Sequence, residues 1–142
     1  MAEVTEAAAI ERARSELRVG NDMPAQAWSV RHIDRPGQSY WLVVLGTRDA
    51  ARGAVAVDAQ SGAVMVSATL PGTQPQLPIN AARALQIAGL PAGTAIGMAW
   101  QSCAATRSPL YPLWAIGAGN ETVYVDQQGR LWRSLEHGER GG

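Results

Sequence analysis

The same series of landmarks occurs twice in this 142-residue sequence, and this repetition constrains the fold more than any other feature. Each series contains a capping residue with an alanine-rich helix, two tryptophans, and a Val-Asp pair before a glycine. The paired landmarks are Val4 and Thr5 with Ile79 and Asn80, Ala9 and Ala13 with Ala84 and Ala88, Ala27 and Trp28 with Ala99 and Trp100, Trp41 with Trp114, Val57 and Asp58 with Val125 and Asp126, and Gly62 with Gly129. The spacing between the copies changes gradually, as altered loop lengths would produce.

Each series begins with a predicted helix. Thr5 can cap a helix over residues 5–18, where Ile10, Ala13 and Leu17 share one face. Gly20 and Asn21 then provide a stop signal. In the second copy Asn80 can cap a helix over residues 81–88, which Gly89 would end.

After each helix come four short runs rich in β-branched and aromatic residues, separated by turn signals. The predicted strands cover residues 28–33, 40–45, 54–58 and 63–68, and then 94–101, 111–117, 122–126 and 130–135. The polar residues 47–53 are expected to form a loop. The sequence predicts an α+β protein of two tandem helix-plus-antiparallel-β-meander units, residues 1–70 and 79–142, joined by a Pro- and Gln-rich linker at 71–78.

A family resemblance rests on three stretches of the first copy and two of the second. The first copy has the Val4 to Ala13 helix, the strand Tyr40-Trp41-Leu42-Val43-Val44, and Val55-Ala56-Val57-Asp58-Ala59-Gln60-Ser61-Gly62-Ala63-Val64; the second has Tyr111 to Trp114 and Val123 to Leu131. These stretches resemble the PepSY domain. The resemblance implies a cystatin-like layout, with a helix packed on a curved antiparallel sheet. It also implies a non-catalytic, inhibitory or chaperone-like role, because PepSY domains occur in peptidase propeptides and in exported or membrane proteins.

The charge balance argues against nucleic-acid binding. The 12 basic residues, all arginine, match 12 acidic residues, so the net charge is zero, and the arginines are scattered. The use of Arg without Lys, with abundant Ala and Gly, indicates a GC-rich bacterial genome. No apolar run approaches the ~20 residues that a membrane span needs. The sequence as given predicts a cytoplasmic protein, or an exported one if a leader has been removed.

Residues capable of catalysis or metal binding lack the expected spacing. Asp58 and Asp126 each precede a glycine turn, where a carboxylate bonds backbone N–H groups, and this interpretation is preferred to acid/base chemistry. His32 and His137 could activate Cys103, but no helix start or glycine-rich elbow accompanies the cysteine. No spaced metal-ligand set and no phosphate loop occur. The sequence therefore predicts a protein that is not an enzyme, with no catalytic residues, metal or cofactor.

The five tryptophans and three tyrosines supply every aromatic side chain, since Phe is absent. One interpretation places them in the core, packed against the helices. The alternative is an exposed sheet face that binds a partner. Trp132, Tyr40, Tyr111 and Arg133 are the candidate binding residues under this alternative. The other arginines that could form its rim are Arg31, Arg48, Arg52 and Arg107.

Three functions remain open from sequence. The first is a non-catalytic binding or inhibitory module that engages a protein or peptide, with a peptidase as one candidate partner, through a sheet face or edge. The second is a structural or assembly protein that forms a homodimer by pairing exposed sheet edges. The third is a small enzyme with a site between the two copies.

Overall fold

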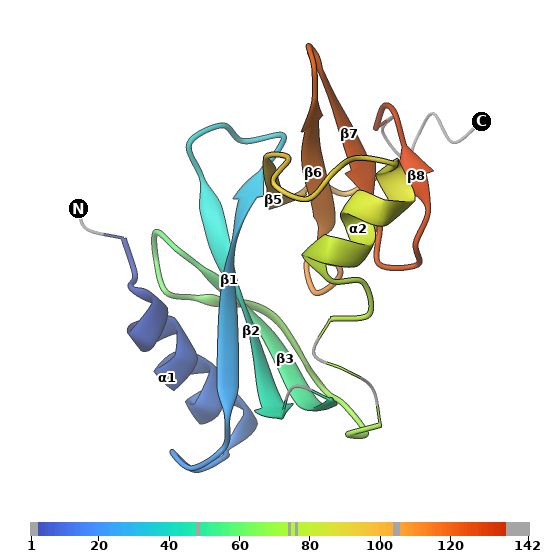
Figure 1. Cartoon of the computed structure of the whole chain (residues 1–142). Coiled ribbons are helices and arrows are strands. Elements are labelled where there is room, and N and C mark those ends of the chain that lie inside the picture. The colour runs from blue at the N-terminus through green and yellow to red at the C-terminus, as the bar shows by residue number, and fades with distance from the viewer. Residues whose placement is uncertain (1–2, 48, 74, 76, 104–105, 136–142) are drawn as a thin grey trace. The chain divides into compact units, whose positions relative to one another are not determined.

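The computed structural model describes residues 3–47, 49–73, 75, 77–103 and 106–135. The chain divides into two compact units, called unit 1 (Met1–Gln76) and unit 2 (Leu77–Gly142). The described residues contain two helices and eight strands (Figure 1). Within each unit the paired strands run antiparallel, which confirms the predicted α+β class.

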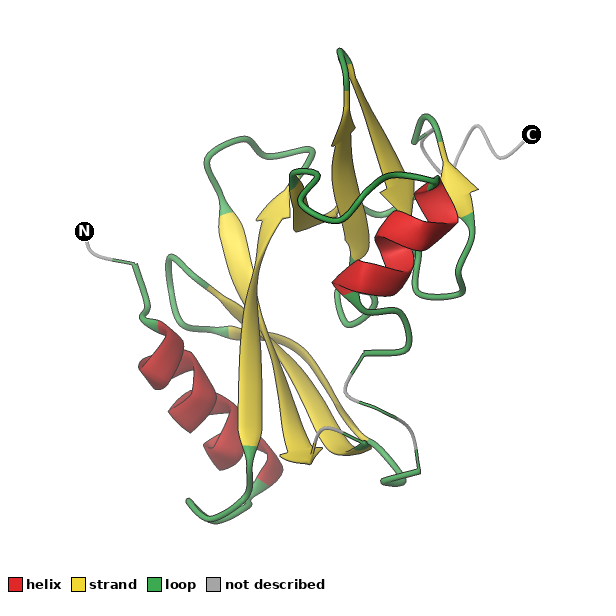
Figure 2. Cartoon of the chain, viewed as in Figure 1, coloured by secondary structure: helices red, strands yellow, loops and turns green. Residues whose placement is uncertain are grey.

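Unit 1 consists of a helix followed by four strands that pair in chain order. The helix α1 covers Glu6–Leu17, and the strands are β1 (Ala25–His32), β2 (Ser39–Thr47), β3 (Ala50–Asp58) and β4 (Val64–Thr69). Their order in the sheet is β4-β3-β2-β1. Figure 2 shows α1 lying along the strands of this unit, each strand reversing direction through a short connection.

The predicted cap of α1 is present, and the helix ends within one residue of the predicted end at residue 18. The Thr5 hydroxyl oxygen accepts a hydrogen bond from the Ala8 N–H at 3.1 Å. The last helical residue is Leu17, and Arg18 follows it as the C-cap in a left-handed conformation with φ of 58°. From Gly20 the chain turns towards β1. The Arg14 guanidinium donates to the Met23 carbonyl in this connection at 2.7 Å. This bond fixes the connection between helix and strand.

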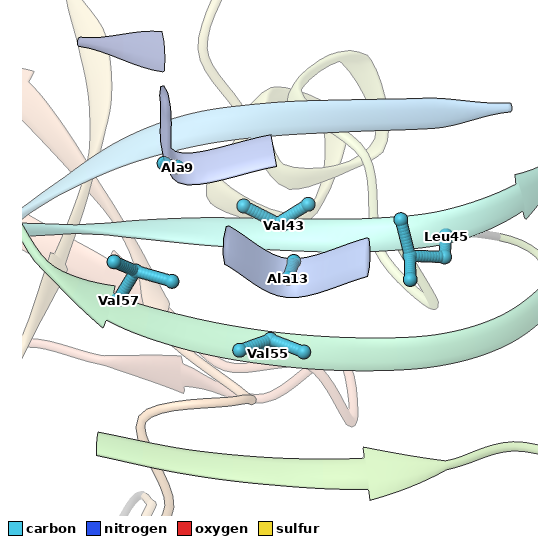
Figure 3. Close-up of a cluster of buried hydrophobic side chains, with 6 residues drawn as sticks. All are labelled: Ala9, Ala13, Val43, Leu45, Val55 and Val57. Atoms are coloured by element: carbon cyan, nitrogen blue, oxygen red, sulfur yellow. The ribbon is translucent and has the colours of Figure 1, made fainter. Parts of the chain in front are cut away.

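The core of unit 1 lies between α1 and the middle of β2 and β3 (Figure 3). Ala9 and Ala13 are fully buried against Val43, Leu45, Val55 and Val57. Ile10 and Leu17, expected on the buried face, are only partly buried at its edge. Alanine at the centre lets the helix approach the strands closely, so the larger side chains lie at the margins of the contact.

Most of the segment predicted as a loop, Thr47 and residues 50–53, belongs to strands. Strand β2 continues to Thr47 and β3 begins at Ala50, with the register shifting between Leu45 and Gly46. Gly46 has φ of 118°, and a Cβ there would lie 2.3 Å from the Ala50 carbonyl oxygen. A glycine therefore permits a bulged hairpin where polar composition alone predicts a loop.

Unit 2 contains a shorter helix, also followed by four strands that pair in chain order. The helix α2 covers Ala81–Ala88, and the strands are β5 (Ile96–Trp100), β6 (Leu113–Ala118), β7 (Glu121–Val125) and β8 (Leu131–Trp132), in the order β5-β6-β7-β8. The Asn80 side chain accepts from the Arg83 N–H at 2.8 Å, and Gly89 ends the helix with φ of 72°. Strand β8 is only two residues long, shorter than the predicted 130–135.

In each unit a tryptophan connects a strand to the residue before the helix cap. The Trp41 indole N–H donates to the Val4 carbonyl at 2.8 Å, and the Trp114 indole N–H donates to the Ile79 carbonyl at 2.7 Å. These tryptophans lie on β2 and β6, opposite Val57 and Val125 respectively. Each bond fixes where its helix begins relative to its strands.

The predicted equivalence of Trp28 and Trp100 is wrong. Trp41 pairs with Ser29, and Trp114 pairs with Met98. When Trp41 and Trp114 are matched, Trp28 therefore falls on Gly97. The Ala-Trp dipeptide occurs in both copies, but a match of two residues does not determine which strand positions correspond.

We predict that replacing Trp114 by Phe lowers the free energy of unfolding by about 2 kcal/mol, and Trp41→Phe by about 1 kcal/mol. Each change leaves a carbonyl before the helix without its donor, and Trp114 is the more deeply buried of the two. Trp28→Phe is the matched control. Trp28 is half-buried like Trp41, but its indole does not donate to the carbonyl of Val4 or Ile79. Urea unfolding measures all three. Equal losses in the three variants would contradict the role of the indole bonds.

Candidate functional site

A pocket of about 430 Å³ opens on unit 2, where loop and turn segments meet. One wall is the loop before β6, the other is the turn between β7 and β8, and Pro78 before α2 completes it. The other lining residues are Thr106, Arg107, Ser108, Tyr111, Asp126, Gln127, Gln128 and Arg130. The pocket therefore contains two guanidinium groups, one carboxylate and one phenol.

The loop before β6 is held by its own hydrogen bonds. Cys103 and Thr106 exchange backbone hydrogen bonds of 3.0 and 3.2 Å. The Thr106 hydroxyl donates to the Tyr111 carbonyl at 2.9 Å, and the Leu110 N–H donates to the Ser108 hydroxyl at 3.2 Å. These bonds use the short polar side chains of the loop for its own shape. The longer Tyr111 side chain remains 44% exposed at the pocket.

Gln127 fastens the β7–β8 turn to the rest of unit 2. Its side-chain oxygen accepts from the Ile79 N–H at 2.9 Å, and its side-chain nitrogen donates to the Pro112 carbonyl at 3.1 Å. Gln127 is buried, so both polar ends find partners inside the protein. The turn, the start of α2 and the start of β6 are thus tied together beneath the pocket.

The Asp126 carboxylate is buried and accepts four hydrogen bonds. One oxygen accepts from the backbone N–H groups of Gln128 and Arg130, both at 2.9 Å. The other accepts from Arg130 Nε at 2.8 Å and from the Trp132 indole at 2.9 Å. The group is 1% exposed. Its acceptor capacity is committed to the turn, so it has little left for a ligand or a proton-transfer step.

These bonds also decide the protonation state of Asp126. Burial, the largest single influence, would raise the pKa of this carboxyl group. The hydrogen bonds from the Arg130 backbone, the Trp132 indole, the Arg130 side chain and the Gln128 backbone together outweigh it and hold the pKa below its ordinary value. Asp126 is therefore ionised at neutral pH and compensates one of the two arginines of the pocket.

Arg130 is a cation held in place on two sides. Its Nε bonds Asp126, and its guanidinium carbon lies 5.4 Å from the centre of the Trp132 ring. Its side chain is nevertheless 53% exposed. The two terminal nitrogens make no hydrogen bond to the residues that the structure describes, and Arg130 lines the pocket, so their donors are available to a ligand.

The other candidate aspartate, Asp58, forms a similar but more exposed turn in unit 1. Its carboxylate accepts from the Gln60 N–H at 3.3 Å and from the Ser61 hydroxyl at 2.7 Å. The Ser61 hydroxyl bond is the largest influence on the pKa of Asp58, which lies below its ordinary value. Both aspartates thus form turns, as the sequence predicts.

The four residues predicted to bind a partner have different surroundings. Tyr111 lines the pocket, half-buried Trp132 bonds Asp126 from the adjoining strand, and Arg133 follows it on the surface. Tyr40 is fully buried, so the expectation that it lies on an exposed face is wrong. It is in unit 1, on β2, with its ring 5.3 Å from that of His32.

Arg130 is the charged lining residue that the sequence does not single out as a candidate. The signal was present, because Arg130 follows the Val-Asp turn whose glycine was recognised. Arg107, considered as a rim residue, does line the pocket. Arg48 and His137 lie outside the described residues.

The remaining candidates for catalysis, Cys103 and His32, are both buried. Cys103 is 1% exposed within the loop before β6. His32 is also buried, and its Nδ1 accepts from the Arg35 guanidinium at 3.3 Å. Burial first, and then Arg35, lower the pKa of His32 against the opposing effects of Asp34 and Asp58. The imidazole is therefore neutral at neutral pH, as an acceptor of an arginine hydrogen bond must be.

The described part of the chain contains neither a cluster of metal-binding side chains nor a helix that could span a membrane. Among these residues, no three His, Cys, Asp or Glu side chains gather as they would around a metal ion. Neither α1 nor α2 has the length and hydropathy that a helix needs to cross a bilayer.

We predict that Asp126→Asn lowers the free energy of unfolding by about 3 kcal/mol, because an amide NH₂ would face the donors of Arg130 and Trp132. Asp58→Asn is the matched control in the more exposed turn, with an expected loss of about 1 kcal/mol. The wild-type contribution of Asp126 should be complete above pH ~4, the ordinary carboxyl pKa, and disappear as the pH falls through its lower folded-state pKa. Urea unfolding of both variants and of the wild type between pH 2 and 7 measures this. Equal losses, or a loss independent of pH, would contradict it.

Comparisons with known proteins identify no family for this chain. No protein-family model matches it, and no curated protein matches it in sequence. Among solved structures, the chain is similar to a putative lipoprotein from Clostridium difficile 630, with 11% sequence identity and a TM-score of 0.38. That alignment covers 96% of this chain and 94% of the other.

Proposed function

We propose that the protein is a non-catalytic binding module of PepSY-like type, which engages a protein or peptide through the pocket of unit 2 and the adjoining strand β8. One observation carries the proposal. The only carboxylate among the lining residues is fully bonded within the turn, whereas Tyr111, Arg107 and Arg130 are exposed. A site of this kind presents donors and an aromatic surface but has no proton acceptor in reserve.

The residue types at the pocket favour a protein or peptide over a small metabolite. Tyrosine and arginine are the side chains most enriched at the centres of protein interfaces, because each combines a large contact surface with hydrogen-bonding ends. Leu131 on β8, the residue after Arg130 in the chain, is 37% exposed and presents an apolar side chain on that strand. Strand β8 also ends the ladder of unit 2, where an extended peptide could add by backbone pairing.

The proposed descent of the two units from one PepSY-like ancestor is supported by three repeated details. In both helices the side chain of the N-cap residue accepts a hydrogen bond from the backbone N–H three residues later, that of Ala8 in α1 and that of Arg83 in α2. Both have the tryptophan bond to the carbonyl before the cap. In both, an aspartate at the end of the third strand (Asp58) or directly after it (Asp126) accepts the N–H of the residue two positions later. Three matched interactions in the same order are more than a shared helix-plus-strands layout requires.

A homodimer is the second candidate, and strand β4 favours it. This six-residue strand ends the ladder of unit 1, and Met65 on it is 36% exposed. Such an edge can pair with the same edge of another copy. Sedimentation equilibrium over a hundredfold range of concentration separates the two proposals, since a concentration-dependent dimer supports the second.

Selection from a random peptide library displayed on phage tests the binding function. We expect enriched peptides whose affinity falls about tenfold with Tyr111→Ala, because truncation of an interface tyrosine typically removes more than 1 kcal/mol. Glu121→Ala, at an exposed residue of β7 that does not line the pocket, is the control and should leave the affinity unchanged. Absence of any enriched peptide, or enriched peptides indifferent to Tyr111→Ala, would contradict the proposal.

A further inference from the structure

The charges of the pocket specify what kind of group it can accept. Arg107 and Arg130 contribute two positive charges, and ionised Asp126 contributes one negative charge. One positive charge is therefore left over among the lining residues. A single carboxylate would neutralise it, whereas a lysine would add a charge of the same sign, and a phosphate dianion would leave a negative excess.

Arg130 is already arranged for such a group. Asp126 holds its Nε and Trp132 covers its face, so the side chain has lost most of its rotamer freedom before a ligand arrives. Binding to a preorganised guanidinium costs less entropy than binding to a free one. The two terminal nitrogens form a planar pair of donors, which matches the two oxygens of a carboxylate.

The backbone of the turn does not offer a second receptor. The N–H groups of Gln128 and Arg130 bond the Asp126 side chain, and the Gly129 N–H bonds the Asp126 carbonyl at 3.1 Å. Peptide C-termini are commonly captured by such consecutive N–H groups. Because these three N–H groups already have acceptors within the turn, a bound carboxylate must be recognised by the arginine side chains. We expect that carboxylate to be at the end of a flexible side chain.

We propose that the pocket binds an acidic side chain, Asp or Glu, of a protein partner, with its carboxylate on Arg130 and Arg107 and the neighbouring peptide against Tyr111. This inference rests on the proposed function and names its ligand class. Arg130 is the fixed receptor, and Arg107 on the loop before β6 is the second, more adaptable cation.

Four immobilised peptide libraries test this assignment. All are acetylated and amidated, with the central residue fixed as Glu, Gln, phosphoserine or Lys and three varied residues on each side. We expect the Glu library to retain at least ten times more protein than the Gln or Lys library, and more than the phosphoserine library. Arg107→Gln and Arg130→Gln should each reduce this preference over Gln to threefold or less. Arg83→Gln removes the same charge from α2 of the same unit, outside the pocket, and should leave the preference intact.

The outcomes separate this inference from the function on which it rests. Equal retention of the Glu and Gln libraries overturns the carboxylate assignment and leaves peptide binding standing. Stronger retention of phosphoserine than of Glu also overturns it, in favour of a dianion. Arg107 has no role in the Asp126 turn, so Arg107→Gln tests ligand binding without disturbing that turn. A preference for Glu that survives in Arg107→Gln overturns the assignment of the carboxylate to this arginine. Retention of no library overturns both the inference and the proposed function.

Discussion

The buried carboxylate of Asp126 is the constraint on which the site of unit 2 depends. An isolated buried charge is strongly unfavourable, and this one is stabilised because four donors reach its two oxygens. The same four bonds close the β7–β8 turn, orient Arg130 and attach Trp132. A residue that the sequence identifies as a turn former therefore also supports a neighbouring cation.

The helices depend in turn on side chains outside them. A helix of eight residues such as α2 is unstable alone, because nucleation is unfavourable and few hydrogen bonds repay it. Its position is set by the Asn80 cap, by the indole bond from Trp114 and by Gln127, which bonds the Ile79 N–H. Since Gln127 also follows Asp126, the start of the helix and the pocket turn share one support. Disturbing either should affect the other.

Local signals predicted much of this fold, and the failures have physical causes. Caps, glycine stops and Val-Asp turns depend on a few adjacent residues, so Thr5, Asn80 and Asp126 could be recognised in sequence. The burial of Tyr40 depends on its surroundings in the folded chain and could not be recognised. The β2–β3 hairpin depends on the positive φ of Gly46, which polar neighbours concealed. Arg130 was missed because its importance comes from a carboxylate four residues earlier that was interpreted only as a turn residue.

The central claim is that Asp126 holds Arg130 ready for a ligand, and NMR of the arginine side chains tests it most directly. The Nε–H of Arg130 bonds a buried carboxylate, so it should exchange with water at least ten times more slowly than the Nε–H of Arg107, a difference that measures protection by the bond. The difference should disappear in Asp126→Asn. An Arg130 Nε–H that exchanges as fast as that of Arg107 in the folded wild-type protein would contradict the account.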